Sequence, residues 1–364
     1  MKRKSIIGVI IFTLLIFSTS FICITKNPDE ISESERRPLK QFPEFNISTL
    51  FSGDFMTEFM EYSTDQMPYR DYLRSIKAVF SKYILGKTDN NGLFTYNDHI
   101  SKIEYPQNEE MIDHAVFKFE NIYNKYMKDK NNKIYLSVIP DKNMFMKDKV
   151  PTINYENFIN KIKNKTPYMK YIDVTDLLSL DDFYKTDSHW MQKKIVDVAE
   201  KIVTDMGNTY IGNFKEKVAT DDFFGVYKGQ SALPHKGDKM TYLLSEGIEN
   251  SKVLYYDTGK AKEGKIYNTD KLKGKDPYEM FLSGSTPLCE IINEKSVSDK
   301  ELIVFRDSYG SSLIPLMVDS YRKITVIDIR YIKSDFIGNF VEFENQDVLF
   351  IYSTTLLNNS LSLQ

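Results

Sequence analysis

Residues 302–310, Leu-Ile-Val-Phe-Arg-Asp-Ser-Tyr-Gly, join a hydrophobic run to a polar turn and a glycine. The uncharged run 302–305 predicts a strand, and the apolar residues of 311–318 predict a helix directly after the turn. In open parallel sheets, ligands bind at the carboxyl ends of the strands, where a following helix directs its N–H groups toward them. Ser308 in this turn is therefore a candidate nucleophile, whereas the simpler interpretation is a helix cap or turn residue.

The rest of the chain alternates strands with helices around this segment. We predict further strands at 93–96, 133–139, 171–174, 324–329 and 348–352. Two long helices are predicted at 109–128 and 190–206. Such alternation predicts an α/β layer fold with a parallel sheet. Residues 208–282 differ because they are rich in Gly, Lys, Tyr and Asp, and they predict an inserted β-rich segment of turns and hairpins near the ligand face.

The N-terminus predicts a segment that enters a membrane. Lys2, Arg3 and Lys4 precede residues 6–24, which carry no charge and would form a helix about 28 Å long, close to the hydrocarbon thickness of a bilayer. A positive flank favours the cytoplasmic side, so the rest of the chain would lie outside the cell membrane behind a single-pass anchor. The alternative is a signal peptide whose cleavage, near the Ser-Thr-Ser at 18–20, leaves a secreted protein.

Three parts of the chain follow from these patterns: an anchor or signal peptide at 1–25, a linker and N-terminal helical region at 26–83, and a domain at 84–364 that contains the inserted segment. The polar, proline-containing residues 26–50 are typical of a stalk. Residues 53–83 have apolar side chains at helical spacing and are interrupted by Pro68, so they predict two helices.

Composition excludes several classes of protein. The chain has 364 residues with 48 Lys plus Arg against 51 Asp plus Glu, a net charge of −3, which argues against a nucleic-acid binder. Two cysteines rule out a disulfide scaffold, and four scattered histidines without a zinc-binding spacing give no credible metal site. The sequence has no Gly-rich phosphate loop, and we expect no cofactor.

Two further segments carry residue types that a serine nucleophile needs. Serine is a weak nucleophile that requires a base, most often histidine, whose tautomer a carboxylate fixes. Asp187 and His189 are two residues apart before Trp190, the only tryptophan, and could meet on a tight turn; a helix cap and a surface histidine are the simpler interpretation. Gly284, followed by Ser285, could bring a backbone N–H close to a ligand or form an ordinary glycine turn.

Taken in order, these motifs resemble the DHHW family, which is related to the alginate O-acetylation proteins and to the SGNH hydrolase superfamily. The motifs are Asp-Ser-His-Trp at 187–190, Phe-Leu-Ser-Gly-Ser at 281–285 and Arg-Asp-Ser-Tyr-Gly at 306–310. Four other segments are similar as well: Ser-Glu-Arg-Arg-Pro-Leu at 34–39, Phe-Pro at 42–43, Asp-Gln-Met-Pro-Tyr-Arg-Asp at 65–71 and Phe-Gly-Val-Tyr-Lys-Gly-Gln-Ser at 224–231. The resemblance covers residues 32–355.

The resemblance implies a flavodoxin-like, three-layer α/β/α, SGNH hydrolase-like domain behind the N-terminal transmembrane helix. It implies a catalytic triad with Ser308 as nucleophile, His189 as general base and Asp187 as the carboxylate that orients the base. Asp and His precede Ser, so the motif order is permuted relative to ordinary SGNH hydrolases. Gly284 matches the oxyanion-hole glycine, with Ser285 and the Ser308 N–H as further donors.

Two positions depart from the family pattern. Ser188 replaces the first of the two histidines in the family's name, which leaves His189 as the acting base. Ser285 stands where relatives often carry Asn, and because a hydroxyl donates more weakly from a shorter arm, the Ser308 N–H gains importance. Substrate contacts, or supports of the site, are expected at Arg306, Tyr309, Tyr227, Gln230 and Trp190, with a buried ion pair as the alternative for Arg306.

The predicted anchor and the triad-like motifs together predict an extracytoplasmic O-acetyltransferase that modifies a cell-surface or secreted polysaccharide through an acyl-enzyme. In systems related by the resemblance, a membrane-bound O-acyltransferase passes acyl groups outward, so we expect such a partner as the acyl donor. A carbohydrate esterase or deacetylase would use the same triad with water as the acceptor. The third hypothesis is a non-catalytic polysaccharide-binding or scaffold protein of an acetylation system.

Overall fold

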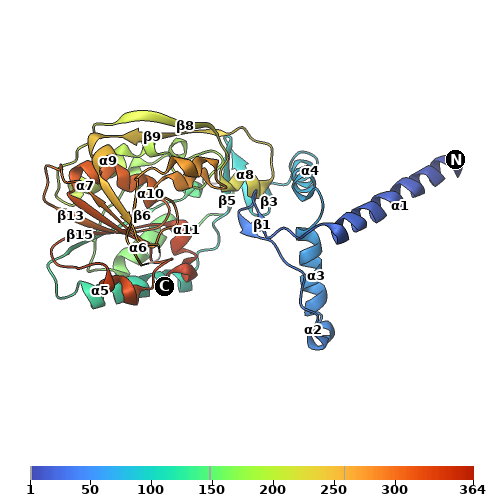
Figure 1. Cartoon of the computed structure of the whole chain (residues 1–364), viewed down its shortest axis with the longest axis horizontal. Helices are drawn as coiled ribbons and strands as arrows, with labels where there is room; N and C mark the ends of the chain where they lie inside the picture. Colours follow the sequence, from blue (N-terminus) through green and yellow to red (C-terminus); the bar gives the residue numbers. More distant parts are fainter. Residues whose placement is uncertain (1, 147–148, 258) are drawn as a thin grey trace. The chain divides into compact units, whose positions relative to one another are not determined.

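The structure, a computed structural model, describes residues 2–146, 149–257 and 259–364 (Figure 1). The chain divides into two compact units. Unit 1 consists of Met1–Asn91 and Lys228–His235, and unit 2 consists of Gly92–Tyr227 and Lys236–Gln364. Unit 2 therefore holds the three motifs that carry the candidate catalytic residues.

Unit 2 is built on an eight-stranded mixed sheet. In spatial order its strands are β11 (Lys262–Gly264), β10 (Lys252–Tyr255), β12 (Leu288–Ile292), β14 (Lys323–Ile327), β13 (Glu301–Arg306), β15 (Asp347–Ser353), β6 (Lys133–Ile139) and β7 (Lys170–Tyr171). The strands from β14 to β7 are parallel, whereas β12, β10 and β11 are antiparallel. The predicted α/β fold with a parallel sheet is confirmed for the five strands from β14 to β7. The prediction was wrong for the rest of the sheet, where β12, β10 and β11 are added in antiparallel fashion.

Both faces of the sheet are buried. Successive side chains of a strand point to opposite faces, and in this sheet both sets lie in hydrophobic clusters. On β13, Leu302 and Val304 belong to one hydrophobic cluster, and Ile303 and Phe305 belong to the other. The first cluster includes residues of α7 (Val196–Asp205), α9 (Glu246–Asn250), α10 (Gly310–Leu313) and the 3-10 helix η7 (Ile314–Ser320). The second cluster includes residues of α5 (Glu109–Tyr126), α6 (Tyr155–Lys165) and α11 (Thr354–Leu357). Figure 1 shows these helices above and below the strands, so unit 2 has three layers.

Two antiparallel pairs lie outside the main sheet of unit 2. Strand β4 (Leu93–Tyr96) pairs with β5 (His99–Lys102), and β8 (Lys215–Phe223) pairs with β9 (Asp238–Leu244). The second pair is the hairpin expected within 208–282, while β10 and β11 of the same stretch extend the main sheet. Short helices complete the chain, namely α8 (Val226–Ser231), η1 (Lys142–Met146), η2 (Thr175–Leu177), η3 (Leu180–Asp182), η5 (Thr269–Lys273), η6 (Pro277–Met280), η8 (Ser334–Asn339) and η9 (Ser360–Ser362).

Unit 1 contains one long apolar helix and several short elements. In α1 (Lys2–Thr25), the window Ile6–Cys23 has a mean hydropathy of 2.6 and is unburied, so it is long and apolar enough to cross a membrane, as a signal sequence also would be. The other elements are β1 (Ile31–Ser32), β2 (Arg37–Pro38), α2 (Ile47–Ser52), α3 (Asp54–Asp65), α4 (Arg70–Tyr83) and β3 (Asp89–Asn90). The two helices predicted on either side of Pro68 are confirmed as α3 and α4.

Three predicted elements differ from the observed ones. The helix predicted at 190–206 begins only at Val196, because Trp190 forms an extended bridge to Phe183 and a single 3-10 turn, η4 (Gln192–Lys194), follows it. The helix predicted at 311–318 is one α-helical turn continued as a 3-10 helix. The strand predicted at 171–174 pairs with the sheet only over β7.

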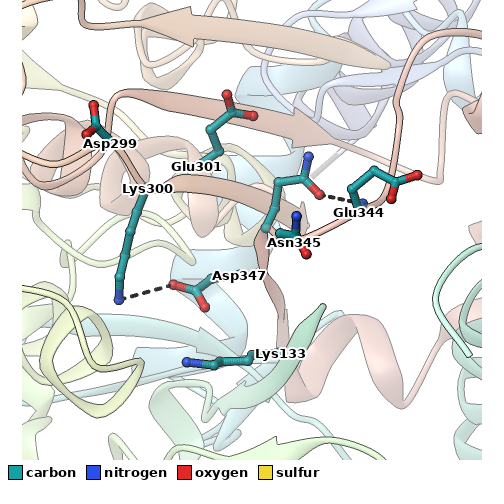
Figure 2. Close-up of a pocket in the computed structure, with 8 residues that line it drawn as sticks. Lys133, Asp299, Lys300, Glu301, Glu344, Asn345 and Asp347 are labelled. Carbon is teal, nitrogen blue, oxygen red and sulfur yellow. Dashed lines mark hydrogen bonds and ion pairs between the residues drawn. The ribbon is translucent and has the colours of Figure 1, made fainter. Parts of the chain in front are cut away.

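A cavity of about 360 Å³ lies at the amino-terminal edge of the sheet (Figure 2). Lys133, Glu301 and Asp347, the first residues of β6, β13 and β15, line it. Lys300 Nζ lies 4.0 Å from the Asp347 carboxylate within it. Parallel sheets bind their ligands at the opposite, carboxyl edge, where the functional site is therefore expected.

Two phenylalanines of α5 differ in burial, and replacing each of them measures how much the packing of α5 against the sheet stabilises the fold. Phe119 is fully buried with its ring 5.2 Å from that of Phe350, whereas Phe117 on the same helix is 56% exposed. Replacing Phe119 by Ala leaves a cavity, and we expect the free energy of unfolding to fall by about 3–5 kcal/mol. Phe117→Ala is the matched control and should change it by less than about 0.5 kcal/mol in urea unfolding. Equal effects of both substitutions would contradict this packing.

Candidate active site

Ser308 lies at the carboxyl end of β13, in the turn that leads into α10. Asp307 fixes this turn through both carboxylate oxygens. Its Oδ1 accepts the Tyr309 N–H at 3.0 Å, and its Oδ2 accepts the backbone N–H and the hydroxyl of Ser353 at 2.8 and 2.6 Å. Because Ser353 ends the neighbouring parallel strand β15, the turn is tied to the edge of the sheet on both sides of the serine.

Asp187 and His189 lie on a tight loop between Phe183 and Trp190, which are bridged in antiparallel fashion. Asp187 Oδ1 accepts the His189 backbone N–H at 3.0 Å and lies 2.6 Å from His189 Nδ1. Asp187 Oδ2 accepts the Val226 N–H at 2.9 Å. The Asp187 side chain is fully buried, so its charge is stabilised by these N–H donors within the protein.

The second ring nitrogen of His189 completes a chain of polar contacts. His189 Nε2 lies 2.7 Å from Ser308 Oγ, and the His189 side chain is 12% exposed. The structure thus brings together Asp187, His189 and Ser308, although 119 positions separate the last two. A carboxylate, an imidazole and a hydroxyl in this order can hold the imidazole tautomer and remove the hydroxyl proton.

Tyr278 of η6 covers one face of the imidazole. Its ring is stacked on His189 with centroids 3.9 Å apart and an interplanar angle of 8°. The Tyr278 hydroxyl donates to the buried Ser312 Oγ at 2.8 Å, which fixes the ring in this position. Tyr278 was not predicted from the sequence, because a tyrosine in a lysine-rich stretch carries no motif that distinguishes it.

Two aromatic residues predicted near the site support its loops. The Trp190 indole N–H is fully buried and donates to the Tyr309 carbonyl at 3.1 Å and to Ser312 Oγ at 3.0 Å. The Tyr309 hydroxyl donates to the Ser188 carbonyl at 2.7 Å. These bonds connect the histidine loop to the serine turn in both directions.

The segment 281–285 has an unusual backbone. Leu282, Ser283 and Gly284 all have positive φ, of 50°, 57° and 78°, a conformation that costs free energy for the first two. Arg306 Nη2 donates to the Gly284 carbonyl at 3.1 Å. The Gly284 N–H donates to the Phe281 carbonyl at 3.1 Å within its own turn, and Ser285 Oγ accepts the Tyr331 hydroxyl at 3.0 Å.

Arg306 forms a buried ion pair, which was the alternative to a substrate contact at this residue. Its guanidinium is 1% exposed and lies 3.4 Å from the fully buried Asp328 carboxylate. Nη1 also donates to Ser311 Oγ at 3.0 Å. Arg306 therefore links the serine turn to the segment that carries Gly284.

Tyr227 and Gln230, the last two predicted contacts, lie in different units. Tyr227 is buried in unit 2, where Lys142 Nζ lies 5.2 Å from its ring centroid. Gln230 belongs to unit 1, where its carbonyl accepts Arg74 Nη2 at 2.9 Å. A substrate contact at either position remains a prediction.

Lys142 is a buried amine that was not predicted from the sequence to lie near the site. Its Nζ donates to the carbonyls of Ile100 and Tyr184 at 2.6 and 2.9 Å. Burial lowers the pKa of Lys142 to about 7, although the nearby Asp187 acts in the opposite direction. Within the described residues, no group of three or more His, Cys, Asp or Glu is arranged to hold a metal ion.

Solved structures share this fold. The chain is similar to a DHHW family protein from Eubacterium siraeum DSM 15702, with 19% identity over 76% of this chain and 95% of that chain and a TM-score of 0.61. It is also similar to Bacillus cereus PatB1 with a sulfonyl adduct, with 18% identity over 73% of this chain and 95% of that chain and a TM-score of 0.59. No protein-family model and no curated protein matches the sequence. The likeness to a DHHW family protein that the motifs predicted is confirmed at the level of the fold.

The stack of Tyr278 on His189 should affect the reactivity of Ser308. We expect Tyr278→Leu to slow the labelling of Ser308 by phenylmethylsulfonyl fluoride by about 2- to 13-fold, since an aromatic stack contributes about 0.5–1.5 kcal/mol. Tyr278→Phe keeps the stacked ring and removes only its bond to Ser312, so it is the matched control for the stack. Rates followed by intact mass that are equal for the two variants would contradict a positioning role for the ring.

The lowered pKa of Lys142 predicts a pH-dependent stability. Between about pH 7 and its ordinary pKa of 10.5, the unfolded chain binds more protons at this residue than the folded chain, so stability rises with pH. Relative to Lys142→Met, the wild type should gain about 1–2 kcal/mol of unfolding free energy between about pH 7.5 and 9. Urea unfolding at both pH values measures this difference, and parallel pH profiles would show that Lys142 does not titrate in this range.

Proposed function

We propose that this protein is an O-acetyltransferase that acts on a cell-surface or secreted polysaccharide through an acyl-enzyme on Ser308. The observation that carries the proposal is the contact chain from Ser308 Oγ to His189 Nε2 at 2.7 Å and from His189 Nδ1 to Asp187 Oδ1 at 2.6 Å. The fold supports it, because the DHHW resemblance implies acetyl transfer. The motif order Asp, His, Ser would be the permuted form of the SGNH arrangement.

In the first half-reaction, Ser308 Oγ attacks the carbonyl carbon of the acyl donor. His189 Nε2 removes the hydroxyl proton and returns it to the oxygen of the leaving alcohol, so the ester bond of the donor breaks as the acyl-serine bond forms. In the second half-reaction, a sugar hydroxyl attacks the acyl-serine. His189 takes its proton and returns it to Ser308 Oγ, while Asp187 stabilises the imidazolium in both halves.

The oxyanion of each tetrahedral intermediate needs hydrogen-bond donors. The Ser308 N–H is one, since it donates no hydrogen bond to any residue in the described part of the chain. The Ser285 hydroxyl is a second candidate, because it accepts from Tyr331 and keeps its own hydrogen to donate. The Gly284 N–H is the third, and it would have to leave the Phe281 carbonyl to contribute.

The remaining predicted residues divide into supports and contacts. Trp190 and Arg306 are almost fully buried, so we assign them to positioning the histidine loop, the serine turn and the Gly284 segment. Tyr309 joins them through its bond to Ser188. Tyr227 and Gln230 are proposed as substrate contacts on the strength of the resemblance.

The acyl group would come from outside this chain. A membrane-bound O-acyltransferase is the proposed donor, and α1 would hold this protein in the membrane with its domain on the extracytoplasmic side. A signal peptide cleaved near the same position would instead give a secreted enzyme. Both arrangements leave the proposed chemistry at Ser308 unchanged.

The test is acyl transfer by the full chain in detergent micelles. Wild type incubated with an acetyl ester should gain the mass of one acetyl group, and the gain should disappear as an added oligosaccharide becomes acetylated. Ser308→Ala should reduce the rate by about 10³-fold or more, since the nucleophile of the triad is lost. Ser362→Ala, which removes an exposed serine hydroxyl, is the matched control and should behave as wild type.

The other outcomes assign the alternatives. Loss of the acyl group to water at the same rate with and without oligosaccharide would indicate an esterase or deacetylase. A folded wild type that forms no adduct, either with the ester or with phenylmethylsulfonyl fluoride, would favour a non-catalytic binding or scaffold protein. Sulfonyl labelling without acylation would indicate that the donor protein is required.

A further inference from the structure

Unit 1 exposes many large apolar side chains. More large hydrophobic side chains are exposed between residues 31 and 85 than in the whole of unit 2. Those on α2, on α3 and in the segment before them are Phe42, Phe45, Ile47, Leu50, Phe51, Met56, Phe59 and Met60, and those on and beside α4 are Tyr69, Tyr72, Leu73, Ile76, Phe80, Tyr83, Ile84 and Leu85. Contiguous patches of this kind mark contacts with proteins or membranes.

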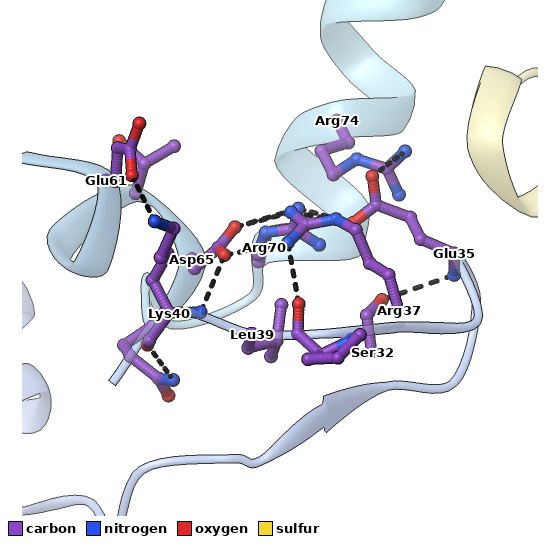
Figure 3. A network of polar contacts seen from close by, with 12 residues as sticks. Ser32, Glu35, Arg37, Leu39, Lys40, Glu61, Asp65, Arg70 and Arg74 are labelled. Atoms are coloured by element: carbon purple, nitrogen blue, oxygen red, sulfur yellow. Dashed lines mark hydrogen bonds and ion pairs between the residues drawn. The ribbon is translucent and has the colours of Figure 1, made fainter. Parts of the chain in front are cut away.

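Helix α4 is turned so that its polar face lies inward. Arg70 and Arg74 have side chains that are 14% exposed, and both pair with the Glu35 carboxylate, Arg74 at 3.0 Å (Figure 3). Ala78 and Ser81 are buried on the same face. The opposite face, from Tyr69 to Tyr83, repeats apolar residues at intervals of three and four and is exposed. A helix in contact with water on that face would be turned the other way.

A polar clamp holds this helical region next to the end of α1. Asp29 donates its backbone N–H to Gln66 Oε1 at 2.8 Å, and Gln66 Nε2 donates to the Asp29 carbonyl at 2.9 Å. Arg37 makes a two-bond contact with the Asp65 carboxylate at 2.8 and 2.6 Å. Asp29 is four residues beyond Thr25, the last residue of α1, so even a fully extended chain keeps Asp29 within about 14 Å of that helix end. Gln66, directly after α3, is bonded to Asp29 and is therefore held near the end of α1 as well.

We propose that the exposed apolar face of α2, α3 and α4 lies in the membrane interface, as a second, peripheral membrane contact beside α1. The occupant is lipid, because the one apolar segment of the described chain that is long enough to cross a bilayer ends within reach of the clamp. The face is rich in aromatic residues, which favour the boundary between headgroups and acyl chains. Phe42, Phe45, Phe55 and Phe59 form one connected group with centroid distances of 5.5 to 6.4 Å.

The experiment places a tryptophan on each part of the face in the full chain, reconstituted into phosphatidylcholine–phosphatidylglycerol vesicles. Phe51→Trp reports on α2 and Ile76→Trp on α4, at side chains that are 86% and 65% exposed. With brominated acyl chains, both should lose about half of their added emission, since interfacial helices bury their apolar face about 5–10 Å deep. Val297→Trp, at an 82% exposed apolar residue of unit 2, is the matched control and should keep its emission. The native Trp190 is fully buried and supplies a constant background.

Each result decides the proposal. Quenching at residues 51 and 76 without quenching at residue 297 supports it. Quenching at residue 297 as well would show unspecific adsorption, and the absence of quenching at residue 51 or 76 would overturn the lipid contact. A blue shift at these two residues without quenching would show that protein, such as a second copy or a membrane partner, covers the face instead. The readout does not involve Ser308, so failure here is independent of the acetyl-transfer proposal.

Discussion

The candidate nucleophile owes its position to one buried carboxylate, that of Asp307. By accepting hydrogen bonds from Tyr309 on one side and from Ser353 on the other, it joins the turn after β13 to the end of β15. Ser308 lies between Asp307 and Tyr309, so moving it would strain these charge-assisted hydrogen bonds, which are stronger than neutral ones. Arg306, one residue earlier, donates to the Gly284 carbonyl, so the three residues 306–308 connect the serine turn to the Gly284 segment.

The imidazole is held by groups from separate parts of unit 2. Asp187 fixes one ring nitrogen, and Val226 and Gly225 hold Asp187, since a Cβ at Gly225 would lie 2.2 Å from the Asp187 Cβ. Tyr278 restricts rotation of the ring by stacking on its face. A histidine restrained at one nitrogen and on one face can present its other nitrogen to Ser308 without reorganisation, which is the condition for efficient proton transfer.

Sequence reasoning succeeded where a local pattern carries the information. The hydrophobic run 302–305 followed by a polar turn predicted the strand and the location of Ser308. The spacing of Asp187 and His189 allowed a tight turn on which they meet, and the family resemblance selected this interpretation over a helix cap and a surface histidine. It failed where tertiary contacts decide. Trp190 was predicted to start a helix. Its buried indole N–H instead donates hydrogen bonds to Tyr309 and Ser312, and the backbone stays extended until η4. Strand β12 was missed because it is too short to show a period. Helix α6 was missed although its apolar residues Tyr155, Phe158, Ile159 and Ile162 repeat at helical spacing. Tyr278 has no signal in a single sequence.

The charge network of unit 1 is a second case in which tertiary contacts decide what local spacing cannot, here the orientation of helix α4. The motifs Ser-Glu-Arg-Arg-Pro-Leu and Asp-Gln-Met-Pro-Tyr-Arg-Asp supply Glu35, Asp65, Arg37 and Arg70, which pair across its interior. Arg74, just beyond the second motif, also pairs with Glu35. The spacing of apolar residues predicts an amphipathic helix at α4, but this spacing is identical whether the apolar face is directed inward or outward. The partners of the arginines decide between the two, and here Glu35 draws the polar face inside. Burying such a network is costly unless its charges are paired, as they are here. The proposed membrane contact would in turn remove the cost of exposing the outward apolar face to water.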